Sequence, residues 1–167
     1  MLLILTSRVF AQGGGYALDF DGVNDYVNLP DFSYLNDLSF SAWFKIDTRN
    51  TWERIFDFGR GNSGDIFLTT KGGRTGGDLE LTIHPFGGTY TINPGVTCDD
   101  GQWHHVVVTW NGWAYTKIYV DGEYAGGHTN SSGSPDYDDT NRSVVFGFHP
   151  NFFKIDISKT FLLVPSG

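Results

Sequence analysis

One stretch of the chain, residues 101–126 (GQWHHVVVTWNGWAYTKIYVDGEYAG), constrains the fold more than any other. Residues 103–110 are rich in β-branched and aromatic side chains, and residues 115–120 alternate between two faces. Asn111-Gly112 and Asp121-Gly122 are two-residue turn sequences, because both central positions of such a turn favour residues that tolerate a positive φ. The pattern therefore predicts three successive antiparallel strands, which form a β-meander.

The composition extends this prediction to the whole chain. The 167 residues include 22 Gly, 14 Phe, 8 Tyr and 5 Trp, and long helix-forming tracts are absent from the sequence. About a dozen short segments with strand patterns follow one another over residues 16–158, separated by glycine-rich turns. We therefore predict an all-β protein built as a sandwich of two antiparallel sheets, with no helix longer than a turn.

Charge and cysteine content exclude several classes of function. The chain has 11 Lys and Arg against 19 Asp and Glu, a net charge of −8. Binding to nucleic acid depends largely on neutralising phosphates, so an acidic chain without a basic stripe is not expected to bind it. No stretch approaches the roughly 20 apolar residues that a membrane-spanning helix needs. Cys98 is the single cysteine, so no internal disulfide can form.

The two ends of the chain differ from its centre. Residues 1–12 read as a truncated signal peptide, with an apolar stretch from Leu2 to Leu5 and a small-residue cleavage pattern near Ala11. A disordered or strand-like tail is the alternative for this segment. Residues 13–158 form one predicted domain, and residues 159–167 form an atypical C-terminal tail. The signal-peptide reading predicts a secreted or cell-surface protein.

The chain resembles the laminin-G-like domains of the concanavalin A-like lectin and glucanase superfamily. The segments that carry the resemblance are ALDFDGVNDYVNLP (17–30), FSAWFKID (40–47), GQWHHVVVTWNG (101–112) and KIYVDGEYAG (117–126). The resemblance implies a jelly roll of two curved sheets. It also implies an extracellular module, commonly part of a larger protein, that binds glycans or proteins and often holds calcium. The sequence after Asp156 departs from the family pattern.

A calcium site is one expectation from the residues and the resemblance. Calcium prefers six to eight oxygen ligands, and Asp21 and Asp25 lie in a short acidic loop. The resemblance implies that Asp21 meets the aspartate of the closing Ile-Asp pair, Asp156, at one rim of the sandwich. The alternative is that the loop residues are turn formers that hydrogen-bond to their own backbone.

Aromatic side chains are the candidates for contacting a ligand. Sugar rings present C–H faces that stack on indole and phenol rings, so four residues are predicted to bind ligand: Trp52, Tyr90, Trp113 and Tyr115. Packing within the protein is the alternative for each of the four. Trp43 and Trp103 occupy strand positions at which the family consensus predicts core or inter-sheet residues.

Evidence for catalysis in the sequence is thin. Asp78 and Glu80 lie on one face of a predicted strand, as paired acid and base catalysis requires, but Gly76 breaks the acidic triplet of related glucanases. His104 and His105 are adjacent, so on a strand they face opposite sides, and structural roles are expected. We therefore predict a non-catalytic recognition module for a glycan or an extracellular protein. A polysaccharide-active enzyme and a purely structural adhesion module are the alternatives.

Overall fold

The computed structural model describes residues 8–12, 15–20, 27–29, 37–46, 53–59, 66–71, 78–83, 89–111, 115–129, 143–146 and 153–156. Within these ranges the chain forms strands, turns and extended segments but no helix. Accordingly, no helix in this part of the chain could cross a membrane. The strands form two sheets in which every pair is antiparallel, and this confirms the predicted fold class.

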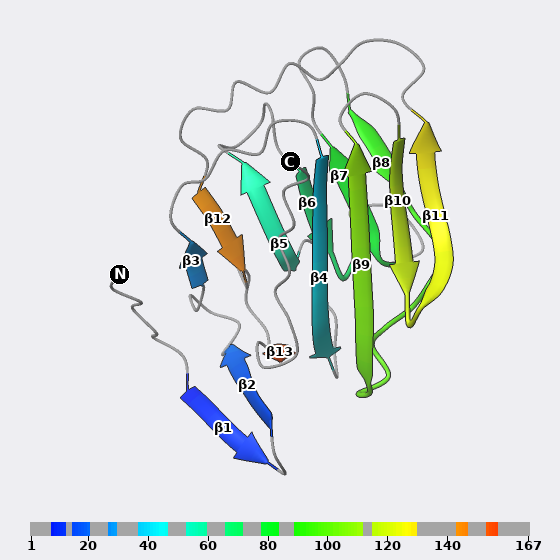
Figure 1. Ribbon diagram of the computed structural model, residues 1–167. Coiled ribbons are helices and arrows are strands. Elements are labelled where there is room, and N and C mark those ends of the chain that lie inside the picture. The colour runs from blue at the N-terminus through cyan, green and yellow to red at the C-terminus, as the bar shows by residue number, and fades with distance from the viewer. Residues whose placement is uncertain are drawn as a thin grey trace.

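The two sheets lie face to face as two layers (Figure 1). The seven-stranded sheet has the order β1 (Arg8–Gln12), β2 (Gly15–Phe20), β13 (Phe153–Asp156), β4 (Asp37–Ile46), β9 (Trp103–Asn111), β10 (Tyr115–Val120) and β11 (Glu123–Thr129). The six-stranded sheet has the order β3 (Val27–Leu29), β12 (Ser143–Phe146), β5 (Arg54–Gly59), β6 (Ile66–Thr69), β7 (Glu80–Ile83) and β8 (Tyr90–Ile92). The predicted meander is the run β9-β10-β11.

The core lies between the two sheets and follows from period-two alternation, because successive side chains of a strand point to opposite faces. The buried residues of β4, β9 and β10 alternate with more exposed neighbours; they are Phe40, Ala42, Phe44, Ile46, Val106, Val108, Trp110, Thr116, Ile118 and Val120. The rings of Phe40 and Phe56 join the sheets, with centroids 4.1 Å apart. Truncating a buried phenylalanine to alanine typically costs roughly 3–5 kcal/mol, so such contacts dominate the stability of the sandwich.

The sheets approach each other closely where β8 and β11 meet. A Cβ atom at Gly126 would lie 3.3 Å from Cγ2 of Ile92, so a side chain at this position would press against the opposite sheet. The rings of Tyr90 and His128 also pack across this edge, with centroids 4.8 Å apart. This edge of the sandwich is therefore closed by direct contact between the two sheets.

The two predicted turns differ in outcome. Asp121 and Gly122 have φ angles of 52° and 88°, so the second turn has the predicted left-handed backbone at both positions. The first turn was predicted wrongly as a two-residue connection, because Asn111 pairs with Tyr115 and residues 112–114 intervene. Asn111 also pairs with Asp37 on β4, and this second pairing extends β9 through the position expected to turn.

Residues 8–12 form β1 and pair with β2 over five positions. This segment falls in the region read from the sequence as a signal peptide, and a strand is the alternative left open there. Residues 1–7 and the predicted C-terminal tail, residues 159–167, lie outside the described part of the chain. The signal-peptide reading stays a prediction.

Strands β6 and β7 are buried on both of their faces. Leu79, Leu81 and Ile83 belong to the core, so Glu80 points to the opposite face of the six-stranded sheet. Only 2% of Glu80 is exposed. Its Oε1 accepts a hydrogen bond of 3.3 Å from the Thr82 hydroxyl, whereas Oε2 has no hydrogen-bond partner among the described residues. A buried oxygen without a partner costs roughly 1–3 kcal/mol, so Glu80 weakens the fold.

Replacing Glu80 should therefore stabilise the protein. Glu80→Met combined with Thr82→Val replaces the carboxyl group and its hydroxyl donor by apolar side chains, so neither position leaves a buried side-chain oxygen without a partner, and we expect the free energy of unfolding to rise by about 1 kcal/mol. Urea denaturation of both proteins measures this difference. An unchanged or lower free energy of unfolding would show that something compensates the Glu80 carboxylate.

Candidate functional site

The outer face of the seven-stranded sheet carries aromatic and polar side chains. Trp43 lies beside His105 in the register, and Lys45 lies beside Trp103. Trp103 is 40% exposed and Trp43 is half-buried, so the prediction that both tryptophans lie in the core or between the sheets is wrong. Since Val106 and Val108 occupy the core, the odd-numbered residues of β9 and their β4 neighbours must point away from it.

One cluster on this face joins β4 to β9. The rings of Trp43 and His105 stack with centroids 4.8 Å apart and planes inclined by 23°. The Ser41 Oγ and His105 Nε2 atoms lie 2.8 Å apart, at hydrogen-bond distance. The imidazole is thus held between an indole and a hydroxyl, which fixes the surface of the sheet at this point.

A second group of side chains lies on β10 and β11, and we call it the tyrosine patch: Tyr115, Lys117, Tyr119, Tyr124 and Gly127. Tyr119 and Tyr124 are paired across the two strands, and their rings meet edge to face with centroids 5.7 Å apart. A Cβ atom at Gly127 would lie 2.9 Å from Oη of Tyr124 and 2.7 Å from the Thr116 carbonyl oxygen. The Tyr124 side chain therefore extends along β11 over a position that accepts only glycine.

Lys117 and Tyr115 complete the tyrosine patch on β10. Lys117 pairs with Gly127, so it lies next to the position over which Tyr124 extends. The Lys117 Nζ atom is 4.8 Å from the centre of the Tyr115 ring, a cation–π geometry. Tyr115 and Tyr124 are 39% and 61% exposed. Two accessible phenol rings on neighbouring strands thus flank one lysine.

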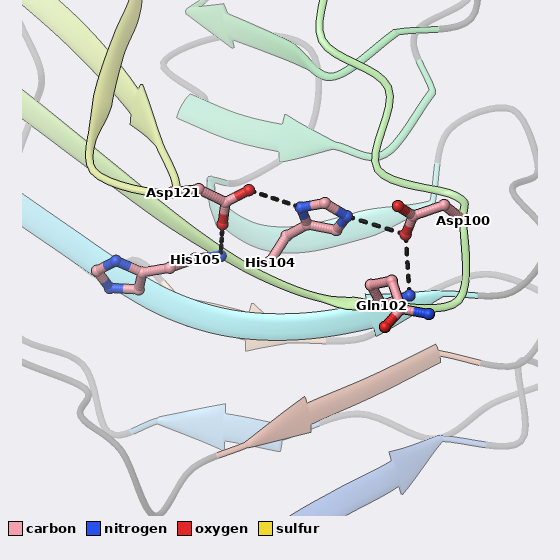
Figure 2. A network of polar contacts seen from close by, with 5 residues as sticks. All are labelled: Asp100, Gln102, His104, His105 and Asp121. Atoms are coloured by element: carbon pink, nitrogen blue, oxygen red, sulfur yellow. Dashed lines mark hydrogen bonds and ion pairs between the residues drawn. The ribbon is translucent and has the colours of Figure 1, made fainter.

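A charged network connects the beginning of β9 to the turn between β10 and β11 (Figure 2). His104 Nδ1 is 2.8 Å from Asp121 Oδ2, and His104 Nε2 is 3.0 Å from Asp100 Oδ1. Asp121 Oδ1 also accepts a 2.8 Å hydrogen bond from the backbone N–H of His105. His104 and His105 point to opposite sides of β9, as predicted from their adjacency.

The protonation state of His104 follows from its partners. Ionised carboxylates only accept hydrogen bonds, so both ring nitrogens can donate at once only in the positively charged imidazolium. Burial acts to lower the pKa of His104, but the hydrogen bonds and charges of Asp121 and Asp100 outweigh burial and raise the pKa above its ordinary value of 6.5. The backbone N–H of Gln102, followed by the His104 side chain, lowers the pKa of Asp100.

The predicted ligand residues are scattered in the described part of the chain. Tyr115 lies in the tyrosine patch, whereas Tyr90 is half-buried on β8 of the other sheet, where it packs against the core. Trp52 and Trp113 lie outside the described residues. Tyr124 and Lys117 were not among the predicted ligand residues. The alternation of residues 115–120 and the Asp121-Gly122 turn place Tyr124 beside Tyr119, on the same face of the sheet as Lys117.

The predicted calcium ligands are only partly described. Asp21 and Asp25 lie outside the described residues, and Asp156 is the last residue of β13. Among the described side chains, no group of three or more metal-ligating residues occurs. The calcium site stays a prediction.

The paired carboxylates considered for catalysis are Asp78 and Glu80. Asp78 is half-buried, and Glu80 is closed off from solvent as described above. A general acid or base must come within hydrogen-bond reach of the substrate. In this arrangement Glu80 does not meet that requirement.

The His104 network predicts how stability depends on pH. Because the folded-state pKa of His104 is raised, its contribution to stability is complete below pH 6.5 and is lost as the pH rises through the folded-state value. We expect the melting temperature of the wild type to fall relative to that of His104→Gln as the pH rises from 6 to 9. Thermal unfolding of both proteins at each pH measures the difference. Parallel curves would contradict the proposed charge on His104.

Comparisons with known proteins agree with this architecture. No curated protein matches the chain in sequence. Among solved structures, domain 4 of AbnA, a GH43 extracellular arabinanase from Geobacillus stearothermophilus, in complex with arabinotriose, has a TM-score of 0.73 and 22% identity. The match covers 96% of this chain and 78% of that one.

Two toxin domains also share the fold. The binding domain of Paraclostridial Mosquitocidal Protein 1 has a TM-score of 0.72 and 16% identity, with 98% of this chain and 44% of that chain covered. The ligand binding domain of botulinum neurotoxin serotype D, in complex with N-acetylneuraminic acid, has a TM-score of 0.65 and 21% identity. That match covers 93% of this chain and 41% of the toxin domain. At these identities the similarity establishes the fold alone.

The sequence itself also matches a laminin G family model. That model describes the concanavalin A-like lectin/glucanases superfamily, and it matches residues 21–157. The matched region includes all strands from β3 to β13. The chain therefore belongs to the laminin-G-like domains of the concanavalin A-like lectin/glucanases superfamily.

Proposed function

We propose that this chain is a non-catalytic glycan-recognition module and that it binds saccharide on the tyrosine patch. One observation carries the proposal: Tyr115 and Tyr124, at 39% and 61% exposure, present two phenol rings on the same face of neighbouring strands. Aromatic rings favour apolar contact on their faces and offer a hydroxyl at the tip, so they suit the alternating C–H and hydroxyl surfaces of sugars.

The rigidity of the patch supports binding. Tyr124 is held by its edge-to-face contact with Tyr119 and by the bare backbone of Gly127 beneath it. Tyr115 stands on a six-residue strand that is hydrogen-bonded on both sides. A ligand that binds rings already held in place loses less conformational entropy than one that must order mobile side chains.

The similar solved structures support the same class of ligand. Two of them are complexes with a saccharide, arabinotriose in the arabinanase domain and N-acetylneuraminic acid in the toxin domain. A non-catalytic role is consistent with the burial of Glu80 and with the description of the two toxin domains as binding domains. We further propose that the module is secreted or displayed at the cell surface as part of a larger protein.

The tyrosine patch gives a direct test by mutation. We expect Tyr115→Ala and Tyr124→Ala each to weaken binding to the strongest ligands of a glycan array by up to about tenfold, the effect of losing one aromatic stacking contact. Trp103→Ala is the matched control. It removes an exposed aromatic from the same face, but eight residues and about 27 Å along β9 from Asn111, the neighbour of Tyr115.

The control separates this proposal from its alternatives. Equal losses in all three variants would place binding elsewhere on the sheet or on the fold as a whole. If no glycan on the array binds, glycan recognition is rejected and the adhesion module becomes the better account. A pull-down with the intact domain from extracellular material would then test for a protein partner.

Calcium is proposed as a stabilising ion near the loop of Asp21 and Asp25, a proposal that rests on the acidic sequence and on the family. An ion that binds only the folded state raises stability by mass action. Millimolar calcium should therefore raise the melting temperature relative to a chelator, and Asp21→Asn should abolish the increase. Identical melting temperatures with calcium and with chelator would reject the site.

A further inference from the structure

The tyrosine patch contains one formal charge, and its position indicates which saccharides bind there. Lys117 lies between the two exposed tyrosines, with Nζ 4.8 Å from the centre of the Tyr115 ring. The ammonium group thus lies over one face of the Tyr115 ring, and a sugar that stacks on this face displaces it to the side of the sugar. Ammonium groups donate hydrogen bonds that are strongest when the acceptor carries a negative charge.

We propose that the tyrosine patch selects anionic saccharides, in which a carboxylate or sulfate group contacts Lys117. The inference rests on the proposed glycan binding and adds the class of ligand. It assigns different tasks to the residues: the tyrosine rings hold the C–H faces of the sugar, and Lys117 discriminates by charge.

The distribution of charge on this face is consistent with the assignment. Among the outer-face positions of β4, β9, β10 and β11 whose side chains are described, the formally charged residues are Lys45 and Lys117. Asp37 occupies a register position beside Asn111, two strands and about 10 Å from Tyr115, and its side chain lies outside the described part of the chain.

The overall charge of the chain excludes long-range attraction as the source of a preference for anionic sugars. A net charge of −8 repels anions at long range, so a preference for an anionic sugar must come from a contact. Removing Lys117 should therefore abolish the preference or reverse it. If selectivity came from the net negative charge of the protein, the wild type would bind neutral sugars more tightly than anionic ones.

The test compares ligands that differ only in charge. Binding of trigalacturonate and of its trimethyl ester is measured by calorimetry, and 3′-sulfolactose is measured against lactose, so that carboxylate and sulfate are distinguished. We expect each anion to bind about fivefold more tightly than its neutral partner, the upper range for an exposed ion pair. Lys117→Met should remove this preference, and Lys117→Arg should retain it.

Lys45→Met serves as the control, because Lys45 lies on the same face about six residues, or 20 Å, along β9 from the partner of Lys117. It should keep the full preference. Equal binding of charged and neutral partners by the wild type, or a preference that survives Lys117→Met, would overturn this inference and leave glycan recognition in place. If neither these probes nor any glycan of the array binds, both proposals fail together.

Discussion

The alternation of β9 between the core and the open face of its sheet is the constraint on which the rest of the structure depends. Val106, Val108 and Trp110 bury one side of the strand between the two sheets. The strand pairs with β4 over nine positions and with β10 over six, so its register sets which residues of both neighbours face outward. A slip of one residue would exchange the core and the outer face along all three strands.

The same constraint creates the tyrosine patch. Ile118 must face the core beside Val108, and Tyr119 must therefore face outward, as must Tyr115 and Lys117. The irregular pairing after Ile118 inserts an additional residue into β11 and sets Tyr124 opposite Tyr119. The His104 network fixes the turn from which β11 begins, because Asp121 binds both the His104 ring and the His105 backbone. The tyrosine patch is therefore held in place by core packing and by the His104 network, although neither of them contacts the exposed faces of its rings.

Local sequence patterns predict much of this fold, but they predict fewer of the residues that form the candidate site. The alternation in β4 and β10 and the positive φ of Asp121 and Gly122 were predictable, because each depends on a few adjacent residues. Trp43 and Trp103 were misplaced in the core or between the sheets, because the family consensus was followed there, whereas the register of β4 and β9 places both on the outer face. Glu80 shows the same limit: its burial on the second face of β7 depends on tertiary structure that alternation does not report. The Asp121-Gly122 turn sets Tyr124 opposite Tyr119, but the reach of the Tyr124 ring over Gly127 depends on the irregular pairing after Ile118, which the local sequence does not indicate.

The central claim is that saccharide binds on the tyrosine patch of β10 and β11, and nuclear magnetic resonance tests it most directly. Backbone amides of the isotope-labelled domain would be followed while the strongest ligand of the glycan array is titrated. The account predicts that the largest shifts fall within residues 115–129, with smaller changes in the outward-facing positions of β9. Shifts concentrated on β5 to β8, with residues 115–129 unchanged, would contradict it and place the binding surface on the opposite sheet.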